Sequence, residues 1–545
     1  MKLSDVQMMF QFIGGLGMFL YGMEAMADGL QKSAGSRMQK LLGVLTANRF
    51  LGVLVGAAVT AIIQSSSATT VMVVGFVNAG MLNLMQATGV IMGANIGTTI
   101  TSWLVSMNEW GEMLSPDFFA PLFIGIGAMI RLFSKDHKKK EVGEILLGFG
   151  VLFVGLSFMS SSIEPYRDAE IFSKAFQTLG SNPILGVLTG AIVTAIIQSS
   201  SASVGILQTL ALNGIVNWRS AIFITLGQNI GTCVTAIISS AGAHKTAKRA
   251  AAIHLMFNVL GAVIFGIIMF VVFMILPDLA MSEISSVEIS VFHTIFNVVN
   301  TIILFPFAGV LVKISQKLIP EGREEEGDEI HLDARMMESP SFAIEAAGNE
   351  IERMGELVLS TLDKSMKNLM TSTQEGVDTT LECEKEIDKS NKLLTNYLVK
   401  VNNLSLSDRQ HLLIKNLMYT IGDFERIGDH CENLAELSQE KVTNKIEFGP
   451  EAMKELEEIC QSVKQSVTCA LEARRKPNMQ DVRLTSKYEQ EVDNLEEELR
   501  ERHIERLSNG TCTPEAGIIF LDALSNLERI SDHAKNIAGY IKEEL

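Results

Sequence analysis

The chain has 545 residues, of which 47% are apolar, and its formal net charge is −17. The apolar share excludes a single ordinary soluble domain, and the charge excludes a protein that lies wholly within a membrane. Residues 1–320 hold 18 Lys/Arg and 15 Asp/Glu, whereas residues 321–545 hold 27 basic and 47 acidic residues. An acidic second half has the wrong sign for a phosphate backbone, so we expect no nucleic-acid partner.

The first half contains apolar stretches long enough to cross a lipid bilayer, which requires about 20 residues. They are residues 7–27, 118–133, 144–163, 250–276 and 291–319, together with two longer blocks at 42–107 and 184–243. The first stretch resembles a signal peptide, but Glu24 and the many later spans favour a retained helix. The six cysteines form no CxxC pair, which favours a reducing compartment over a disulfide framework.

The loops between these stretches alternate between basic and acidic charge. Basic residues lie at Arg37 and Lys40, between Lys135 and Lys140, between Lys245 and Arg249, and at Lys313 and Lys317; acidic residues lie between Glu109 and Asp117, between Glu164 and Glu170, and between Asp278 and Glu288. Because basic loops stay on the cytoplasmic side, the acidic tail is predicted to be cytoplasmic, beneath a plasma (inner) membrane. The same rule makes blocks 42–107 and 184–243 cross the membrane in opposite directions.

These two blocks are also copies of each other. At a constant offset of 134 residues, the segment from Gly52 to Ala68 matches the segment from Gly186 to Ala202 at all but two of 17 positions. The register continues to GlyAlaAsnIleGlyThr at 93–98 and GlyGlnAsnIleGlyThr at 227–232. Two homologous units of opposite topology are typical of secondary transporters built from inverted repeats.

Each copy places a GlnSerSerSer run, at 64–67 and 198–201, within an otherwise apolar stretch. Four consecutive polar residues are costly against lipid, which predicts a re-entrant hairpin or broken helix near the midplane. Helix N-termini there would attract an anion, and hydroxyl and amide oxygens would suit a small cation such as Na⁺. The alternative is simple packing of two helices through small polar residues. Likewise, Gly97 and Gly231 either break a helix beside the site or permit close packing.

Residues 52–108 contain no Asp, Glu, Lys or Arg, and neither do residues 186–218. An anion bound between the repeats therefore meets no arginine, and an isolated anion in a low-dielectric medium is prohibitively unstable. Co-bound cations become a physical requirement for anion transport. The same lack of charge would also let a neutral solute bind.

Paired GlnSerSerSer runs followed by AsnIleGlyThr resemble the type II sodium–phosphate cotransporter family over most of residues 1–320. The resemblance implies Na⁺-coupled transport of inorganic phosphate. It implies phosphate contacts at Gln64, Ser65, Ser66, Ser67, Gln198, Ser199, Ser200 and Ser201, and sodium contacts at Thr60, Gln64, Ser67, Asn95, Thr98, Thr194, Gln198, Ser201, Asn229 and Thr232.

The second copy departs from the first at three places. Cys233 replaces the equivalent of Thr99, Gln228 that of Ala94, and the pair at 203–204 that of Thr69 and Thr70. The number and symmetry of the sodium sites therefore stay open. Export of phosphate, transport of another oxyanion, a membrane-anchored metal or phosphate sensor, and a homodimer also stay open.

A charged linker at 321–340 precedes a helical tail at 341–545, whose two halves, 341–445 and 450–545, repeat a motif. GluArgIleGlyAspHis at 425–430 becomes GluArgIleSerAspHis at 528–533. Acidic residues four apart share a helix face, where like charges repel by about 0.2–0.5 kcal/mol. Grouped carboxylates are plausible ligands for divalent or iron ions, and the alternative is a solvated face paired with Arg426 and Arg529. The candidate ligands are Glu384, Asp388, Glu425, Asp429, Asn433, Glu489, Asp493, Glu528, Asp532 and Asn536.

This tail resembles PhoU-type phosphate-regulatory domains, which implies two three-helix bundles, a regulatory or metal-binding role and cytoplasmic partners. No nucleophile–base constellation or nucleotide-binding loop occurs in the sequence, so we expect no enzyme and no ATP-driven pump. The sequence thus predicts an all-α protein with a domain at 1–320, a polytopic membrane transporter with two inverted repeats and re-entrant hairpins. A cytoplasmic PhoU-like pair of three-helix bundles follows it.

Overall fold

The computed structural model describes residues 3–45, 48–110, 116–166, 182–320, 332–371 and 373–545. Within these ranges the chain forms α-helices and short 3₁₀ turns, and its only β contact is an isolated bridge between Asn217 and Glu283. The predicted all-α class is therefore confirmed. The described chain forms two compact units: the first holds the residues up to 320 together with 333–342, and the second holds Leu332 and residues 343–545.

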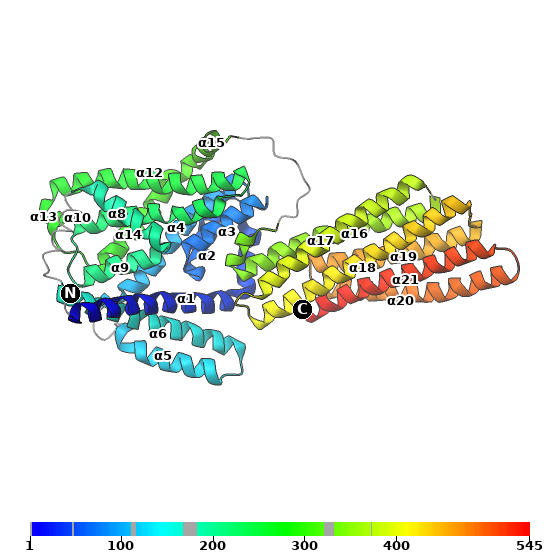
Figure 1. Ribbon diagram of the computed structural model, residues 1–545, viewed down its shortest axis with the longest axis horizontal. Coiled ribbons are helices and arrows are strands. Elements are labelled where there is room, and N and C mark those ends of the chain that lie inside the picture. Colours follow the sequence, from blue (N-terminus) through cyan, green and yellow to red (C-terminus); the bar gives the residue numbers. More distant parts are fainter. Residues whose placement is uncertain (1–2, 46–47, 111–115, 167–181, 321–331, 372) are drawn as a thin grey trace. The chain divides into compact units, whose positions relative to one another are not determined.

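The first unit holds the apolar helices (Figure 1). They are α1 (Leu3–Leu45), α2 (Arg49–Ile63), α3 (Ser66–Asn78), α4 (Leu84–Ser106), α5 (Pro116–Phe133), α6 (His137–Ile163), α8 (Pro183–Ile197), α9 (Ser200–Leu212), α10 (Trp218–Gly231), α11 (Cys233–Ser240), α12 (Lys245–Ile275), α13 (Pro277–Met281), α14 (Ser286–Leu304) and α15 (Ala308–Leu318), followed by a 3₁₀ turn, η4 (Ala334–Glu338). Seven of the described helical stretches are long and apolar enough to cross a membrane.

Four apolar helices of this unit are too short to span a bilayer. Helices α2 and α8 have 15 residues, and α3 and α9 have 13. At 1.5 Å per residue these helices extend about 20–22 Å, less than the hydrocarbon core of about 30 Å. The pairs α2–α3 and α8–α9 are therefore hairpins of the predicted re-entrant kind, whereas the inverted orientation of the two repeats stays a prediction.

Glycines let each hairpin lie against the long helix that follows it. A Cβ atom at Gly93 of α4 would lie 2.0 Å from the carbonyl oxygen of Val53 in α2, and one at Gly227 of α10 would lie 1.9 Å from that of Val187 in α8. Both distances are far below any van der Waals contact, so the backbones touch directly. Such small-residue contacts are typical of helix pairs in membranes.

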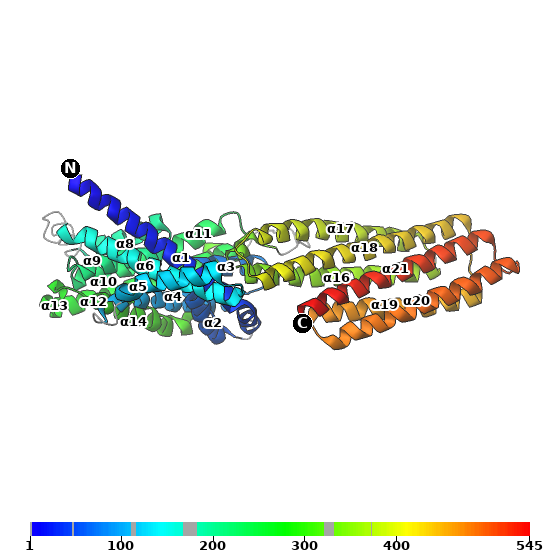
Figure 2. The same ribbon diagram turned by 90° about the horizontal axis from the view of Figure 1, so that it is seen from below.

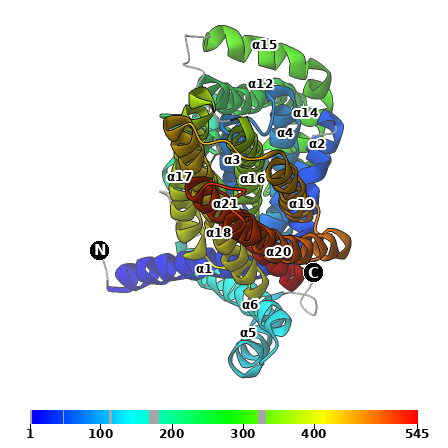
Figure 3. The same ribbon diagram turned by 90° about the vertical axis from the view of Figure 1, so that its right-hand side faces the viewer.

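Helices α1, α5 and α6 form a separate layer at the edge of the first unit (Figures 1 and 3). Their apolar contacts centre on the fully buried Phe19 and Phe153. The Nζ atom of Lys32 on α1 lies 3.0 Å from Oε2 of Glu144 on α6. The side chains of Arg37 and Lys40, together with Glu112, Asp168, Glu170 and linker residues 321–331, lie outside the described part of the chain.

The second unit consists of six long helices (Figure 2). They are α16 (Pro340–Thr371), α17 (Gln374–Asn402), α18 (Asp408–Asn444), α19 (Pro450–Arg475), α20 (Met479–Ser508) and α21 (Pro514–Glu544). Helices α16–α18 come from the first tail repeat and α19–α21 from the second, which agrees with the predicted pair of three-helix bundles. Fully buried side chains such as Phe424 and Phe520 form the core.

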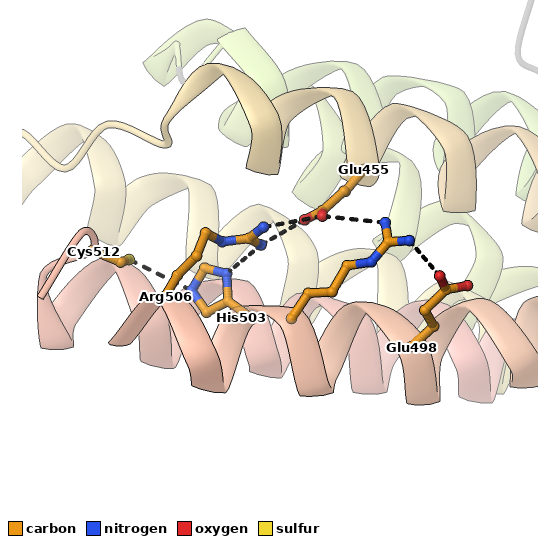
Figure 4. A network of polar contacts seen from close by, with 6 residues as sticks. Glu455, Glu498, His503, Arg506 and Cys512 are labelled. Atoms are coloured by element: carbon orange, nitrogen blue, oxygen red, sulfur yellow. Dashed lines mark hydrogen bonds and ion pairs between the residues drawn. The ribbon is translucent and has the colours of Figure 1, made fainter. Parts of the chain in front are cut away.

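A polar network ties α19 to α20 inside this unit (Figure 4). The guanidinium of Arg506 donates hydrogen bonds to both carboxylate oxygens of Glu455, one of them at 3.0 Å. The ring of His503 lies 2.9 Å from the same guanidinium, 3.5 Å from Sγ of Cys512, and stacks on Phe520. All six cysteines are free thiols.

Replacing Gly227 by alanine tests the close approach of α8 and α10. The new methyl group would meet the carbonyl oxygen of Val187, so the helices must separate, and overpacking of this kind costs about 1–3 kcal/mol. We expect a lower thermal unfolding midpoint of the purified protein in detergent. Gly125→Ala is the matched control because a Cβ atom at this position would meet no other atom within 4 Å. Equal midpoints for the two variants would contradict the direct backbone contact.

Candidate functional site

The first GlnSerSerSer run forms the tip of the α2–α3 hairpin. Gln64 follows α2 with φ 56° and ψ 21°, in the left-handed region that residues other than glycine seldom adopt. Its N–H still donates to the carbonyl oxygen of Thr60 at 2.8 Å. Ser65 then adopts an extended conformation and caps α3, because its hydroxyl accepts a hydrogen bond from the N–H of Ala68 at 3.1 Å.

The second run repeats this geometry at the tip of the α8–α9 hairpin. Gln198 has φ 59° and ψ 19°, and Ser199 caps α9 by accepting from the N–H of Ala202 at 3.2 Å. The two tips meet, since the hydroxyl oxygens of Ser66 and Ser200 are 3.4 Å apart. The structure therefore brings both predicted phosphate-binding runs to one place and starts a helix at each.

A buried pair of hydroxyl groups ties together the two arms of each hairpin. Thr60 donates to Thr69 at 3.0 Å in the first, and Thr194 donates to Ser203 at 2.9 Å in the second. These two threonines were predicted to contact sodium, and both are buried behind the tips. The substitution of Thr69 by serine at 203 therefore preserves this feature of the repeat.

The AsnIleGlyThr runs lie directly behind the tips. A Cβ atom at Gly97 or Gly231 would approach Cβ of Thr60 or Thr194, respectively, within 2.7 Å. Gly97 lies inside the unbroken helix α4, whereas Gly231 ends α10 just before the break at Thr232. Both glycines thus permit close packing, and one of them also adjoins a helix break. The predicted sodium contacts on these runs, Asn95, Thr98, Asn229 and Thr232, are all buried.

The two tips differ in how tightly they are enclosed. Gln64 is buried, and its side-chain oxygen accepts a hydrogen bond from Thr101 on α4 at 2.9 Å. Gln198 is exposed, and the equivalent residue on the second repeat, Thr235, donates to the carbonyl oxygen of Thr232. The first tip is therefore closed by its neighbouring helix, while the second is open.

The tips can bind an anion without any charged side chain. The first N–H groups of a helix have no partner within that helix, so α3 and α9 direct free donors toward the point where Ser66 and Ser200 meet. The dipoles of the two helices add partial positive charge at the same point. Hydroxyl and amide oxygens of the surrounding residues can hold cations beside the anion.

The sequence interpretation missed a second polar set on α12 and α14. His254 and Asn258 on α12, and His293 and Asn297 on α14, are essentially fully buried. Among the described residues, the side-chain oxygens of Asn258, Asn297 and Asn300 accept no hydrogen bond. A repeated pattern, HisLeuMetPheAsnVal at 254–259 and HisThrIlePheAsnVal at 293–298, was the available signal.

The amide of Asn258 connects this set to the second repeat. Its Nδ2 atom lies 3.3 Å from Sγ of Cys233, the residue that replaces Thr99. The Sγ atom in turn lies 3.7 Å from the carbonyl oxygen of Asn229. Buried amide oxygens without a partner are costly, and a cation or a hydrogen-bond donor could satisfy them.

In the tail, the structure places the predicted carboxylates in two groups. Glu384 and Asp388 on α17 face Glu425 and Asp429 on α18, and Glu489 and Asp493 on α20 face Glu528 and Asp532 on α21. In the second group, Glu489, Asp493 and Asp532 each contribute one carboxylate oxygen to a cluster. These three oxygens lie within 4.8 Å of one another.

Burial is the main cause that raises the pKa of Glu384, and the nearby carboxylates of Glu432, Asp388 and Asp429 raise it further. Burial likewise raises the pKa of Asp493, with a smaller contribution from Glu489. In both groups the ionised form of the carboxylates is therefore destabilised, and a bound cation would stabilise it. Basic residues already offset part of it, because Lys535 pairs with Glu489 and Arg426 with Asp429.

The two predicted asparagine ligands point elsewhere. Asn433 donates to Oδ1 of Asn526 at 3.0 Å, and Asn536 donates to Oδ1 of Asp423 at 3.3 Å. They lie beside His430 and His533, whose ring centroids are 5.7 Å apart. The pattern of residues four apart placed these asparagines on the right helices, but the structure joins them to a separate contact between α18 and α21.

A family model described as Na⁺/Pi-cotransporter matches residues 18–161 and 168–293. A second model, the PhoU domain, matches residues 351–438 and 456–541. In Bacillus subtilis, the uncharacterized protein YqeW is 30% identical over 310 residues, which are 55% of this chain and 95% of that protein. The chain belongs to the Na⁺/Pi-cotransporter family. Its C-terminal half contains two PhoU matches, and the family makes it a multi-pass membrane protein.

The names of two further relatives state phosphate export in one case and sodium-dependent phosphate transport in the other. A Salmonella typhimurium protein provisionally named inorganic phosphate export protein YjbB is 21% identical over 98% of this chain and 97% of its own length. Sodium-dependent phosphate transport protein 2A of Rattus norvegicus is 31% identical over 113 residues, which are 20% of this chain and 17% of that protein.

The hydrogen bond between Thr101 and Gln64 predicts a difference between the two repeats. Thr101→Val removes the donor to a buried amide oxygen, and an unsatisfied buried group costs about 1–3 kcal/mol. Thr235→Val is the matched control, since that hydroxyl bonds only within its own helical turn. We expect a larger fall in the thermal unfolding midpoint for Thr101→Val. Equal falls would show that the closed first tip does not depend on this contact.

Proposed function

We propose that this protein couples Na⁺ to the movement of inorganic phosphate across the plasma membrane. The observation that carries the proposal is the meeting of two helix N-termini at Ser66 and Ser200, whose hydroxyl oxygens are 3.4 Å apart. The two GlnSerSerSer runs would hold the phosphate oxygens through backbone N–H and hydroxyl groups. Family membership and the rat relative's name support the pairing of sodium with phosphate.

Sodium is needed because the uncharged cores of the two repeats offer the anion no cationic side chain. Residues 52–108 and 186–218 hold no Lys or Arg, so co-bound Na⁺ would neutralise the phosphate. The proposed sodium contacts are the threonines, asparagines and tip residues already named from the sequence. The free amide oxygens of Asn258 and Asn297 extend this set, because they are hard ligands in a buried position.

The direction of net transport follows from the ion gradients rather than from the site. The first relatives carry the name of phosphate export proteins, so export is the second candidate function. A carrier of this design transports either way, and the Na⁺ and phosphate gradients decide the net flux. The PhoU-like tail, which the charge rule predicts to be cytoplasmic, would regulate this flux through partners or bound ions.

Reconstituted protein tests the coupling. An inward Na⁺ gradient should drive uptake of radiolabelled phosphate into proteoliposomes, and replacing Na⁺ by K⁺ should reduce the rate at least about tenfold, because the anion would lack its counter-charge. Ser66→Ala combined with Ser200→Ala should abolish uptake. Ser161→Ala, an exposed position on α6, is the control.

Uptake that is indifferent to Na⁺, or unaffected by the double variant, would exclude the proposed site. Competition with arsenate and sulfate distinguishes phosphate from other oxyanions. Reversing the gradients distinguishes export from import. If the intact protein gives no phosphate flux at all, the sensor alternative is favoured.

The two carboxylate groups of the tail support a second proposal, that the PhoU-like domain binds divalent or iron ions. Glu489, Asp493 and Asp532 already have ligand atoms within 4.8 Å of one another. Asn433 and Asn536 are left out of this proposal because their amides hydrogen-bond elsewhere. Bound metal would offset the repulsion that raises the pKa values of these carboxyl groups.

Titration of the full-length protein with Mn²⁺, followed by electron paramagnetic resonance, tests the tail sites. Asp493→Asn combined with Asp532→Asn should remove the ions bound at the second group and leave those at the first, because the two groups share no residue. Glu498→Gln on α20 is the control, since this exposed carboxylate pairs with Arg502. Unchanged Mn²⁺ stoichiometry in the double variant would contradict a site at these residues.

A further inference from the structure

A short segment after the linker packs onto the end of the first hairpin. Residues 333–342, which include the turn η4 and the first residues of α16, belong to the first unit. We call residues 333–342 the clamp. The clamp covers the last turns of α3, the helix that begins at the first tip.

A buried ion pair organises the clamp. Arg335 donates to Oδ1 of Asp333 at 2.7 Å through Nε and to Oδ2 at 2.5 Å through Nη2. Asn78, the last residue of α3, donates to the same Oδ2 at 2.9 Å. The Asp333 side chain is 5% exposed, so its charge depends on these partners, and removal of one partner from a buried ion pair is strongly destabilising.

The clamp also reaches the second repeat. Nη1 of Arg335 donates to the carbonyl oxygen of Ser239 at 2.8 Å, in the last turn of α11. A cation at a helix C-terminus is favourable because unpaired carbonyls and the helix dipole are negative there. The Asp333–Arg335 pair therefore joins α3, which starts at the first tip, to α11, which follows the AsnIleGlyThr run of the second repeat.

Helix α3 has features that fit the clamp and that its equivalent in the second repeat, α9, lacks. A Cβ atom at Gly75 would lie 3.2 Å from Cβ of Arg335, so this position leaves little room for a side chain. Phe76 packs edge-to-face on Phe342, with ring centroids 5.4 Å apart. At the offset of 134, the equivalents of Gly75 and Asn78 are Thr209 and Leu212, which supply neither the space nor the amide.

From these contacts we infer that the clamp is a positioning device that links the PhoU-like domain to the first phosphate-binding tip. Helix α3 is short and continuous, so a restraint at Asn78 fixes the position of Ser66 at its other end. Helix α16 begins in the clamp and continues into the second unit, which makes the clamp the covalent entry to that domain. The inference rests on the proposed function for its substrate, phosphate.

Transport by full-length variants tests the positioning role. Arg335→Ala and Gly75→Thr should each raise the KM for phosphate about three- to tenfold, with a maximal rate within about twofold of wild type, because the tip is displaced but not altered. The double variant should show no more than the larger single effect, since both changes act through one contact. Lys389→Ala is the control: this lysine forms an exposed pair with Glu386 within α17.

A purely structural role would lower the yield of folded protein and leave the KM of the folded fraction unchanged. Unchanged KM values in both variants, or effects that add in the double variant, would overturn the inference.

A cross-link tests the contact without any transport assay. Cysteines at 75 and 335 would have Cβ atoms 3.2 Å apart, close to the separation of about 3.5–4.5 Å in disulfides. With a protease site inserted between residues 321 and 331, the disulfide should hold the two fragments together on a non-reducing gel. No cross-link in folded protein would overturn the clamp. If wild-type protein moves no phosphate but the cross-link forms, the proposed function fails and the clamp contact stands.

Discussion

Each hairpin of the membrane unit depends on one glutamine held in a left-handed backbone conformation. This conformation costs a residue other than glycine about 1–2 kcal/mol. At Gln64 and Gln198 it ends one helix and lets the following serine cap the next. Without the break, α2 and α3 would continue as one helix, and no free N–H groups would face the membrane interior. The position of the two tips follows from this local strain.

The packing of the hairpins against the rest of the unit keeps this strain in place. Gly93 and Gly227 bring α4 and α10 into direct backbone contact with α2 and α8, and hydroxyl pairs tie the hairpin arms together. Closely packed helices change position by switching between discrete arrangements, because a dense interior does not deform gradually. The open second tip and the closed first tip are consistent with two repeats that take different positions within one state.

The sequence predicted the break because a run of four polar residues cannot face lipid, whatever the surrounding fold. It also predicted the duplicated tips, since a constant offset of 134 residues is visible without any structure. It could not predict that Gln64 is buried and accepts a hydrogen bond from Thr101, whereas Gln198 is exposed. That difference depends on which helix lies across each tip. For the same reason, a spacing of four residues grouped Asn433 with the carboxylates, although its amide bonds to Asn526 on another helix. Helical periodicity predicts which residues share one face of a helix. Only tertiary packing determines which residues of other helices they contact.

The positions at which the two repeats differ in sequence explain why their surroundings differ in the structure. If the two repeats were identical, a contact made by one would also be available to the other. A segment that contacts only one repeat must therefore bind where the two sequences differ. Gly75 and Thr209 occupy equivalent positions, yet only the glycine leaves space for the segment that leads into the tail. Cys233 replaces a threonine beside Asn258, which gives the second repeat a soft sulfur where the first has a hydroxyl. Duplication therefore explains how an anion can bind between two helix N-termini. Divergence at a few buried positions makes the surroundings of the two tips different.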